Sequence, residues 1–206
     1  MEVKAQSSKL KAQSYNLKLK TKIKPDVRYL YDMKSVLYDK KWLTTVENFP
    51  VYYIYRGVKE KNCLRYDITD ITSRLLGREF PKTKGHEHPK ECQEFITVLE
   101  GKAIFLFQKS KGKRILDVYQ ILAKKGDWVI APAGYAHITI NPGPEKLKIA
   151  NWIDKKCWGI YDFIEKLQGA CYYYTKSGWI KNKKYDIIPK LRTNQPLKRK
   201  LRFFEK

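Results

Sequence analysis

The three histidines of the sequence are spaced as ligands of a single metal ion. His86 and His88 form an HxH pair, and two residues at this spacing point to the same face of an extended strand. Glu94 begins the next apolar run, and His137 lies in a later one. Three imidazoles and one carboxylate suit Fe, Ni, Mn, Zn or Co better than calcium or a thiolate-bound cluster. The sequence therefore predicts one divalent transition metal per subunit, held by His86, His88, Glu94 and His137.

The sequence around these residues resembles the two motifs of the cupin family. The stretch GDWVIAPAGYAHITIN, from Gly126 to Asn141, has the spacing of the second motif, G(x)5PxGxxH(x)3N. The stretch HEHPKECQEFITVLEG, from His86 to Gly101, resembles the first motif, HxH(x)nE(x)6G, with a longer gap before the glutamate and a displaced glycine ahead of HxH. The resemblance implies an all-β fold, a cupin barrel (double-stranded β-helix or jelly roll) with short peripheral helices and N- and C-terminal extensions.

Two residues between the motif positions are alternative ligands. Glu91 also follows the HxH pair closely, but only Glu94 has the distance to Gly101 that the first motif requires. Cys92 could supply a thiolate to the metal. The four cysteines lie far apart without a CxxC pair, so we expect buried thiols rather than structural disulfides.

Short β-branched and aromatic runs separated by turn residues predict the strands that position these ligands. The turns contain pairs such as Glu100-Gly101 and Asn141-Pro142, and no long helical pattern lies between the runs, which favours antiparallel pairing. A short helix is expected over 161–167 and a further strand over 171–174. The eight predicted barrel strands are 51–55, 65–69, 94–99, 103–108, 115–122, 128–131, 137–140 and 148–152.

We divide the chain into a barrel with two extensions. Residues 1–49 are expected to form an N-terminal arm and a short helical segment that packs on the barrel, with helical turns over 32–43. Within the arm, residues 1–24 are expected to be mobile or to pair with another subunit. Residues 50–175 form the cupin barrel, and residues 176–206 form a basic C-terminal extension.

The composition is that of a folded and strongly basic protein. Of the 206 residues, 43% are hydrophobic, and the formal net charge is +22. The lysine clusters contain no recognisable nucleic-acid motif, so we expect a solvated basic surface and consider nucleic acid an unlikely partner. No apolar stretch is long enough for a membrane helix, and the first residues lack the apolar core of a signal peptide. We therefore expect a cytoplasmic protein with no membrane partner.

A second resemblance is more specific about function. The run GREFPKTKGHEH, from Gly77 to His88, resembles the GxEFxxTKGHxH signature of archaeal cupin-type glucose-6-phosphate isomerases, which are small homodimeric metalloenzymes. The resemblance implies a phosphorylated hexose substrate, a homodimer, and reversible conversion of glucose 6-phosphate to fructose 6-phosphate. It implies Glu94 and Tyr161 as catalytic residues, and it implies substrate-binding roles for Tyr52, Thr69, Thr83, Gly85, Trp152 and Tyr161.

The chain departs from the pattern of these isomerases at two pocket positions. Trp152 stands where the family has a pocket tyrosine, and Gly159 stands where it has a histidine. Tyr135 and the tyrosines of 172–174 are possible substitutes for that histidine. The departures leave open whether the substrate is another phosphosugar.

The chemistry of the segment beside the HxH pair agrees with a phosphate site. Thr83, Lys84 and Gly85 offer a hydroxyl, an ammonium and an open backbone next to the metal. Isomerisation could then proceed by proton transfer through an enediol, with Glu94 as base, or by a hydride shift. Two alternatives are a cupin dioxygenase of the acireductone type and a metal-bearing cupin that binds a sugar phosphate without turnover.

Overall fold

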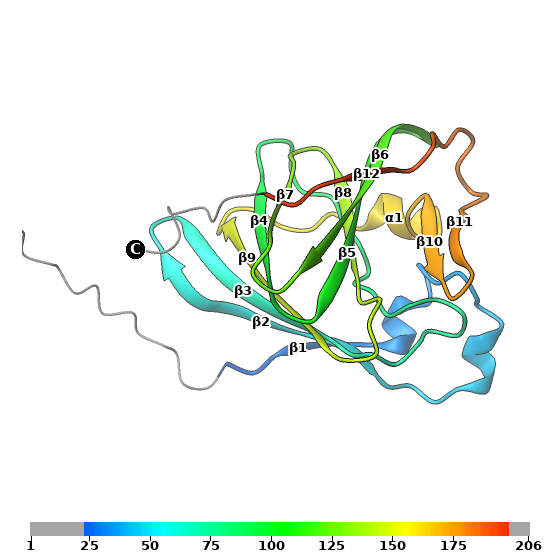
Figure 1. Cartoon of the computed structure of the whole chain (residues 1–206), viewed down its shortest axis with the longest axis horizontal. Helices are drawn as coiled ribbons and strands as arrows, with labels where there is room; N and C mark the ends of the chain where they lie inside the picture. Colours follow the sequence, from blue (N-terminus) through cyan, green and yellow to red (C-terminus); the bar gives the residue numbers. More distant parts are fainter. Residues whose placement is uncertain (1–22, 198–206) are drawn as a thin grey trace, which may run out of the picture.

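The computed structural model describes residues 23–197, which form two main β-sheets and a separate two-stranded sheet (Figure 1). The larger sheet has the strand order β1-β2-β3-β9-β4-β7, and the smaller has the order β12-β6-β5-β8. All pairings within the two sheets are antiparallel except that of β12 with β6. Residues 1–22 of the predicted N-terminal arm and residues 198–206 of the predicted C-terminal extension lie outside the described residues.

The strands span Asp26–Tyr29 (β1), Pro50–Lys61 (β2), Leu64–Ile71 (β3), Glu94–Glu100 (β4), Lys102–Lys111 (β5), Arg114–Lys124 (β6), Trp128–Ala131 (β7), Ala136–Ile140 (β8), Leu147–Asp154 (β9), Tyr172–Thr175 (β10), Gly178–Lys181 (β11) and Arg192–Asn194 (β12). One α-helix, α1, spans Asp162–Lys166, and two short 3-10 helices span Leu30–Met33 and Trp42–Thr45. The eight predicted barrel strands coincide with β2 to β9, so the all-β cupin barrel expected from the sequence is confirmed.

The core between the sheets follows from the alternation of side chains along each strand. Ile96 and Val98 of β4 are buried against Phe105 and Phe107 of β5 in one apolar cluster. The other face of β5 is buried too, because Leu106 packs with Cys171 and neighbouring residues of the chain after α1. The segment after the barrel therefore covers the outer face of the smaller sheet, with α1 and the β10-β11 hairpin at one end (Figure 1).

The expectation of free buried thiols is wrong for three of the four cysteines, because two form a disulfide and Cys63 is exposed. Cys92 and Cys157 form a disulfide although they are 65 residues apart in sequence. The loop before β4 and the loop after β9 bring their Cα atoms to 6.1 Å, a distance that a disulfide spans. Sequence spacing could not show this contact, because it depends on the pairing of β4 with β9. Cys63 and Cys171 remain free thiols.

The HxH pair does not lie on a regular strand. Residues 72–93 form a long connection that passes beside β8 and pairs with it only through isolated bridges, one of which joins His86 to His137. Gly85 makes this approach possible, because its φ is +82° and a Cβ atom there would lie 2.6 Å from Ile138 Cγ1. The bridge brings two metal-ligand candidates together directly.

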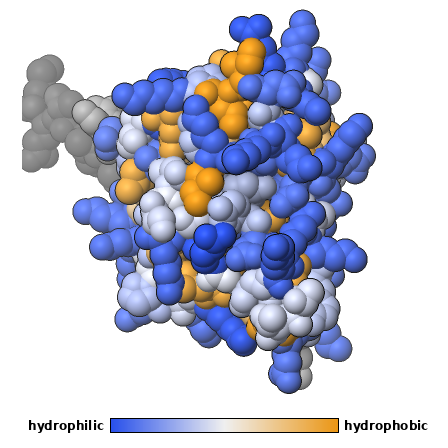
Figure 2. Space-filling view, turned by 90° about the vertical axis from the view of Figure 1, so that its right-hand side faces the viewer, coloured by the Kyte–Doolittle hydropathy of each residue, from blue (hydrophilic) through white to orange (hydrophobic). Residues whose placement is uncertain are grey.

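One face of the molecule is largely hydrophilic. The face shown in Figure 2 carries mostly hydrophilic side chains, and its hydrophobic patches are small and separate. Among residues 23–197, no helix is long and apolar enough to cross a membrane.

Asn141, the last residue of the second cupin motif, should be important for stability. Its buried side-chain amide donates hydrogen bonds to the carbonyls of Ile71, Thr72 and Glu145, and its Oδ1 accepts one from Gly143 N–H. Asn141→Ala should lower the free energy of unfolding by about 2–4 kcal/mol, because buried polar groups lose their partners. Urea denaturation measures the change, and a loss below about 0.5 kcal/mol, the usual size for a surface substitution, would contradict this role.

Candidate active site

Four side chains from three segments converge between the two sheets. His86 and His88 come from the connection before β4, Glu94 begins β4 in the larger sheet, and His137 lies in β8 of the smaller sheet. Their ligand atoms all lie within 4.8 Å of one another, and the four residues form a cluster that could hold a metal ion. The predicted ligand set is therefore assembled in space.

The distances within the cluster are those of groups that face a common point. His86 Nε2 is 3.1 Å from His88 Nε2, which is 2.9 Å from Glu94 Oε2. His137 Nε2 lies 3.0 Å from the same carboxylate oxygen. Glu91, the rival carboxylate, is exposed, and Cys92 is bonded to Cys157, so neither belongs to the cluster.

The tautomer of His88 shows that a cation fits between these groups. Its Nδ1 lies 2.9 Å from the carbonyl oxygen of Trp158, so a neutral ring must donate there. The Nε2 lone pair then faces the Glu94 carboxylate at 2.9 Å, where two acceptors repel. Either a proton or a metal ion removes that repulsion, and a carbonyl partner of this kind is the usual support of a metal-binding histidine.

The pKa shifts describe the same need for positive charge. Burial opposes the charged form of Glu94, but His137 and His88 outweigh it and hold the Glu94 pKa well below its ordinary value. Burial also opposes a proton on His88, but the hydrogen bond to Glu94 raises the pKa of that ring. Burial and the neighbouring His137 lower the pKa of His86 well below its ordinary value. The site thus contains an ionised carboxylate and a neutral imidazole, which are the forms that bind metal.

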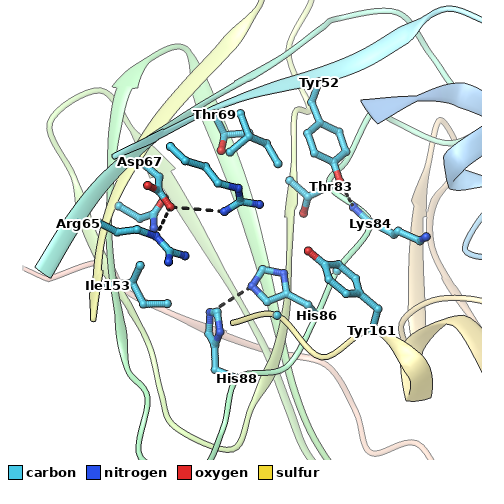
Figure 3. Close-up of a pocket in the computed structure, with 15 residues that line it drawn as sticks. Tyr52, Arg65, Asp67, Thr69, Thr83, Lys84, His86, His88, Ile153 and Tyr161 are labelled. Carbon is cyan, nitrogen blue, oxygen red and sulfur yellow. Dashed lines mark hydrogen bonds and ion pairs between the residues drawn. The ribbon is translucent and has the colours of Figure 1, made fainter. Parts of the chain in front are cut away.

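A pocket opens beside the cluster and contains His86 and His88 in its wall (Figure 3). It has about 580 Å³ of empty space, including its open mouth. The lining residues come from alternate positions of β2, β3 and β9 and from the segments around HxH and after β9: Tyr52, Ile54, Arg56, Arg65, Asp67, Thr69, Thr83, Lys84, Gly85, His86, His88, Asn151, Ile153, Gly159 and Tyr161.

Five of the six predicted substrate-binding residues line this pocket: Tyr52, Thr69, Thr83, Gly85 and Tyr161. Thr83 Oγ1 accepts a hydrogen bond from Thr139 N–H, which leaves its hydroxyl hydrogen available to a ligand. The Tyr52 hydroxyl lies 3.3 Å from the backbone nitrogen of Lys84, and burial raises the Tyr52 pKa, which keeps the hydroxyl protonated. This end of the pocket is therefore rich in neutral hydrogen-bond donors.

The expected ammonium of Lys84 is directed elsewhere. Lys84 Nζ forms an ion pair with Glu165 of α1 and lies 5.9 Å from the centre of the Tyr161 ring. Figure 3 shows this side chain pointing away from the labelled histidines. The backbone of Lys84, rather than its charge, faces Tyr52.

Trp152 does not line the pocket, contrary to expectation. Side chains alternate along β9, so Asn151 and Ile153 face the pocket while Trp152 faces the other side. There its ring packs against Tyr66, with ring centres 4.9 Å apart. The pocket-side residues of β9 are Asn151 and Ile153, the two neighbours of Trp152 in the sequence.

None of the suggested substitutes for the missing histidine reaches the pocket. The Tyr135 hydroxyl donates to Asp117, and the hydroxyls of Tyr172 and Tyr173 donate to backbone carbonyls. At Gly159 a Cβ atom would lie 3.1 Å from both His86 and the Tyr161 ring. A side chain at this position would therefore press on a metal-ligand candidate.

Three charged pocket residues escaped the sequence analysis, namely Arg56, Arg65 and Asp67. Period-two alternation was the signal that could have found them. Arg65 and Asp67 share the face of Thr69 on β3, and Arg56 shares the face of Tyr52 on β2. Following every second residue along β3 from Thr69 and along β2 from Tyr52 would have included all three charged residues.

Comparison with known proteins places this site in a family. A family model described as Glucose-6-phosphate isomerase (GPI) matches residues 27–190, which is most of the chain. The chain belongs to this family. Relatives named glucose-6-phosphate isomerase include a protein of Pyrococcus furiosus, 33% identical over 129 residues, and one of Thermococcus litoralis, 34% identical over 128 residues.

These matches to members of the glucose-6-phosphate isomerase family are partial. The first covers 59% of this chain and 66% of the Pyrococcus protein, and the second covers 58% and 64%. The aligned part thus spans just under two thirds of these relatives. Among solved structures, an oxalate decarboxylase of Lactobacillus farciminis in a formate complex matches 58% of this chain and 34% of its own, with 16% identity and a TM-score of 0.44.

Binding of a divalent transition metal should stabilise the fold through Glu94. At a free metal concentration of about 100 times Kd, the melting temperature should rise by roughly 5–10 °C. Glu94→Gln should largely lose this rise, whereas Glu91→Gln, which changes an exposed carboxylate three positions away, should keep it. Calorimetric melting with metal analysis of the bound fraction tests this. Equal stabilisation of both variants would contradict the assignment.

Proposed function

We propose that this chain catalyses the reversible conversion of glucose 6-phosphate to fructose 6-phosphate. The observation that carries the proposal is a metal-ligand cluster in the wall of a pocket whose other end offers hydroxyl and backbone donors. The family match supports the same reaction. An isomerase that acts on a phosphorylated sugar needs both features. The donors bind the phosphate, and the metal-ligand cluster acts on the C1–C2 end of the open sugar.

The phosphate is proposed to bind at Thr69, Thr83, Gly85 and Tyr52. The free hydroxyl hydrogen of Thr83 and the backbone N–H of Gly85 are suited to phosphate oxygens, whereas the N–H groups of Thr83 and Lys84 donate to the Thr139 carbonyl and the Tyr52 hydroxyl. Gly85 contributes through its open backbone, because a side chain there would collide with Ile138. With the phosphate held here, the sugar chain extends toward His86 and His88 (Figure 3).

His86, His88, Glu94 and His137 are proposed to hold the metal, which is one of Fe, Ni, Mn, Zn or Co. When bound, such an ion supplies Lewis acidity for the sugar oxygens. Glu94 is the candidate base that moves the proton between C2 and C1, because its pKa is held well below the ordinary value and it belongs to the cluster whose His86 and His88 line the pocket. The Tyr161 hydroxyl faces the same space and is proposed to donate a proton to the ring oxygen during ring opening.

The setting of the enzyme is also proposed from the family. We expect a homodimer that acts in the cytoplasm, in glycolysis and gluconeogenesis, on a phosphorylated hexose. The Cys92–Cys157 disulfide is uncommon in a reducing cytoplasm outside hyperthermophiles. In a cytoplasmic setting the bridge persists only if it resists reduction.

A coupled assay tests the proposed reaction. The metal-loaded chain should convert fructose 6-phosphate to glucose 6-phosphate, a chelator should abolish turnover, and one of the five metals should restore it. Glu94→Gln should lower kcat by at least about 100-fold with an unchanged fold, because a general base of this kind contributes roughly that factor. Glu91→Gln provides the control and should remain active. If the metal-loaded chain shows no chelator-sensitive turnover, the proposed reaction is wrong.

A further inference from the structure

Arg65 is a pocket residue without a role in the proposed reaction so far. It lies on β3 two residues before Asp67, and both side chains face the pocket. Figure 3 shows the Arg65 guanidinium on the side of the pocket where His88 lies. Arg65 is thus close to the metal end of the pocket.

Asp67 fixes the orientation of this guanidinium. Its side chain is only 4% exposed, and Oδ2 accepts a hydrogen bond of 2.9 Å from Arg65 Nε. Its other oxygen, Oδ1, accepts one of 2.8 Å from Gly57 N–H, at a bulge of β2 where Gly57 has a φ of +61°. A buried carboxylate anchored to the backbone holds an arginine more firmly than an exposed one does.

The terminal nitrogens of Arg65 remain available to a ligand. Within residues 23–197, the hydrogen bond that its side chain donates is the one from Nε. Arg56 differs, because its Nε donates a hydrogen bond to Asp26 and its Nη1 lies 3.6 Å from Asp67 Oδ2. Lys84 is paired with Glu165. Of the three cations that line the pocket, Arg65 therefore keeps the most donor capacity free.

The guanidinium of Arg65 can bind an anion at this place. Arg56 pairs with Asp26 and lies near Asp67, whereas Arg65 pairs with Asp67 through Nε and keeps its terminal nitrogens for a ligand. The neutral donors around Thr83 suit the phosphate, which leaves the arginines beside the part of the sugar that reaches the metal. Negative charge forms on O1 and O2 of that part when the enediolate develops.

We infer that Arg65, oriented by Asp67 and supported by Arg56, forms an anion subsite at the metal end of the pocket. The subsite stabilises the negative charge that develops on O1 and O2 of the sugar, and it favours ligands that carry a carboxylate at C1. This inference rests on the proposed function for the position of the sugar. It assigns Arg65 as a further catalytic residue and Asp67 as its positioning residue.

Two probes separate this subsite from a general electrostatic effect. The compound 6-phosphogluconate carries a carboxylate at C1, whereas glucitol 6-phosphate has a neutral C1 hydroxyl and the same phosphate. Titration calorimetry of the metal-loaded protein measures the affinity for each. Arg65→Met should lower the affinity for 6-phosphogluconate by about 10- to 100-fold, which is the contribution expected of a hydrogen bond between charged groups. It should lower the affinity for glucitol 6-phosphate by less than about threefold.

Arg114→Met is the matched control, because Arg114 is exposed at the start of β6 and is not part of the pocket lining. It removes the same charge and should leave both affinities unchanged. In the coupled assay Arg65→Met should mainly lower kcat, and Arg65→Lys should recover part of it. Asp67→Asn, if it folds, should lower the same affinity and kcat as Arg65→Met, but by a smaller factor.

The results distinguish the subsite from the proposed reaction. If Arg65→Met lowers the affinity for both ligands equally, or for neither, the assignment of the subsite is wrong whatever the activity of the wild type. If the wild type has no isomerase activity but prefers 6-phosphogluconate through Arg65, the subsite stands and the proposed reaction fails. If the folded, metal-loaded wild type binds neither ligand, both are overturned.

Discussion

Three imidazole nitrogens and one carboxylate oxygen crowd into the space between the two sheets, and this crowding requires a cation. The Trp158 carbonyl fixes the Nδ1 hydrogen of His88, so the Nε2 lone pair must face Glu94 at 2.9 Å. The surrounding structure depends on this arrangement. β4 and β8 come from opposite sheets, and the segment with His86 pairs with β8 beside His137. The barrel therefore holds the imidazole nitrogens and the Glu94 carboxylate close together. Without a positive charge between them, these acceptors would repel one another.

The pocket extends from this cluster along the inward-facing positions of three neighbouring strands. β2, β3 and β9 are adjacent in the larger sheet, so their alternate side chains form one continuous wall. Neutral donors gather near Thr83, and guanidiniums gather near Asp67. The Cys92–Cys157 disulfide joins the loop before Glu94 to the loop that carries Trp158. Both loops reach a metal-ligand candidate, so the covalent link connects the two sides of the metal end.

Much of the fold and the ligand cluster could be predicted, because both leave local patterns. Strand runs alternate with a period of two, and the spacing between Glu94 and Gly101 or between Gly126 and His137 reflects turns of fixed length. The disulfide could not be predicted, since it depends on which loops the sheets bring together. Trp152 was misplaced because a shift of one position along β9 reverses the face. Arg65 and Asp67 were missed although the same alternation, followed back from Thr69, contains them.

The central claim is that the four side chains bind one metal, which a phosphosugar then approaches through the pocket. X-ray absorption spectroscopy of the metal-loaded protein, before and after addition of fructose 6-phosphate, tests it most directly. The account predicts scattering from three imidazoles together with oxygen neighbours, no sulfur scattering, and a change in the oxygen shell when the sugar binds. Fewer than three imidazoles, a sulfur neighbour, or a metal shell unchanged by saturating sugar would contradict it.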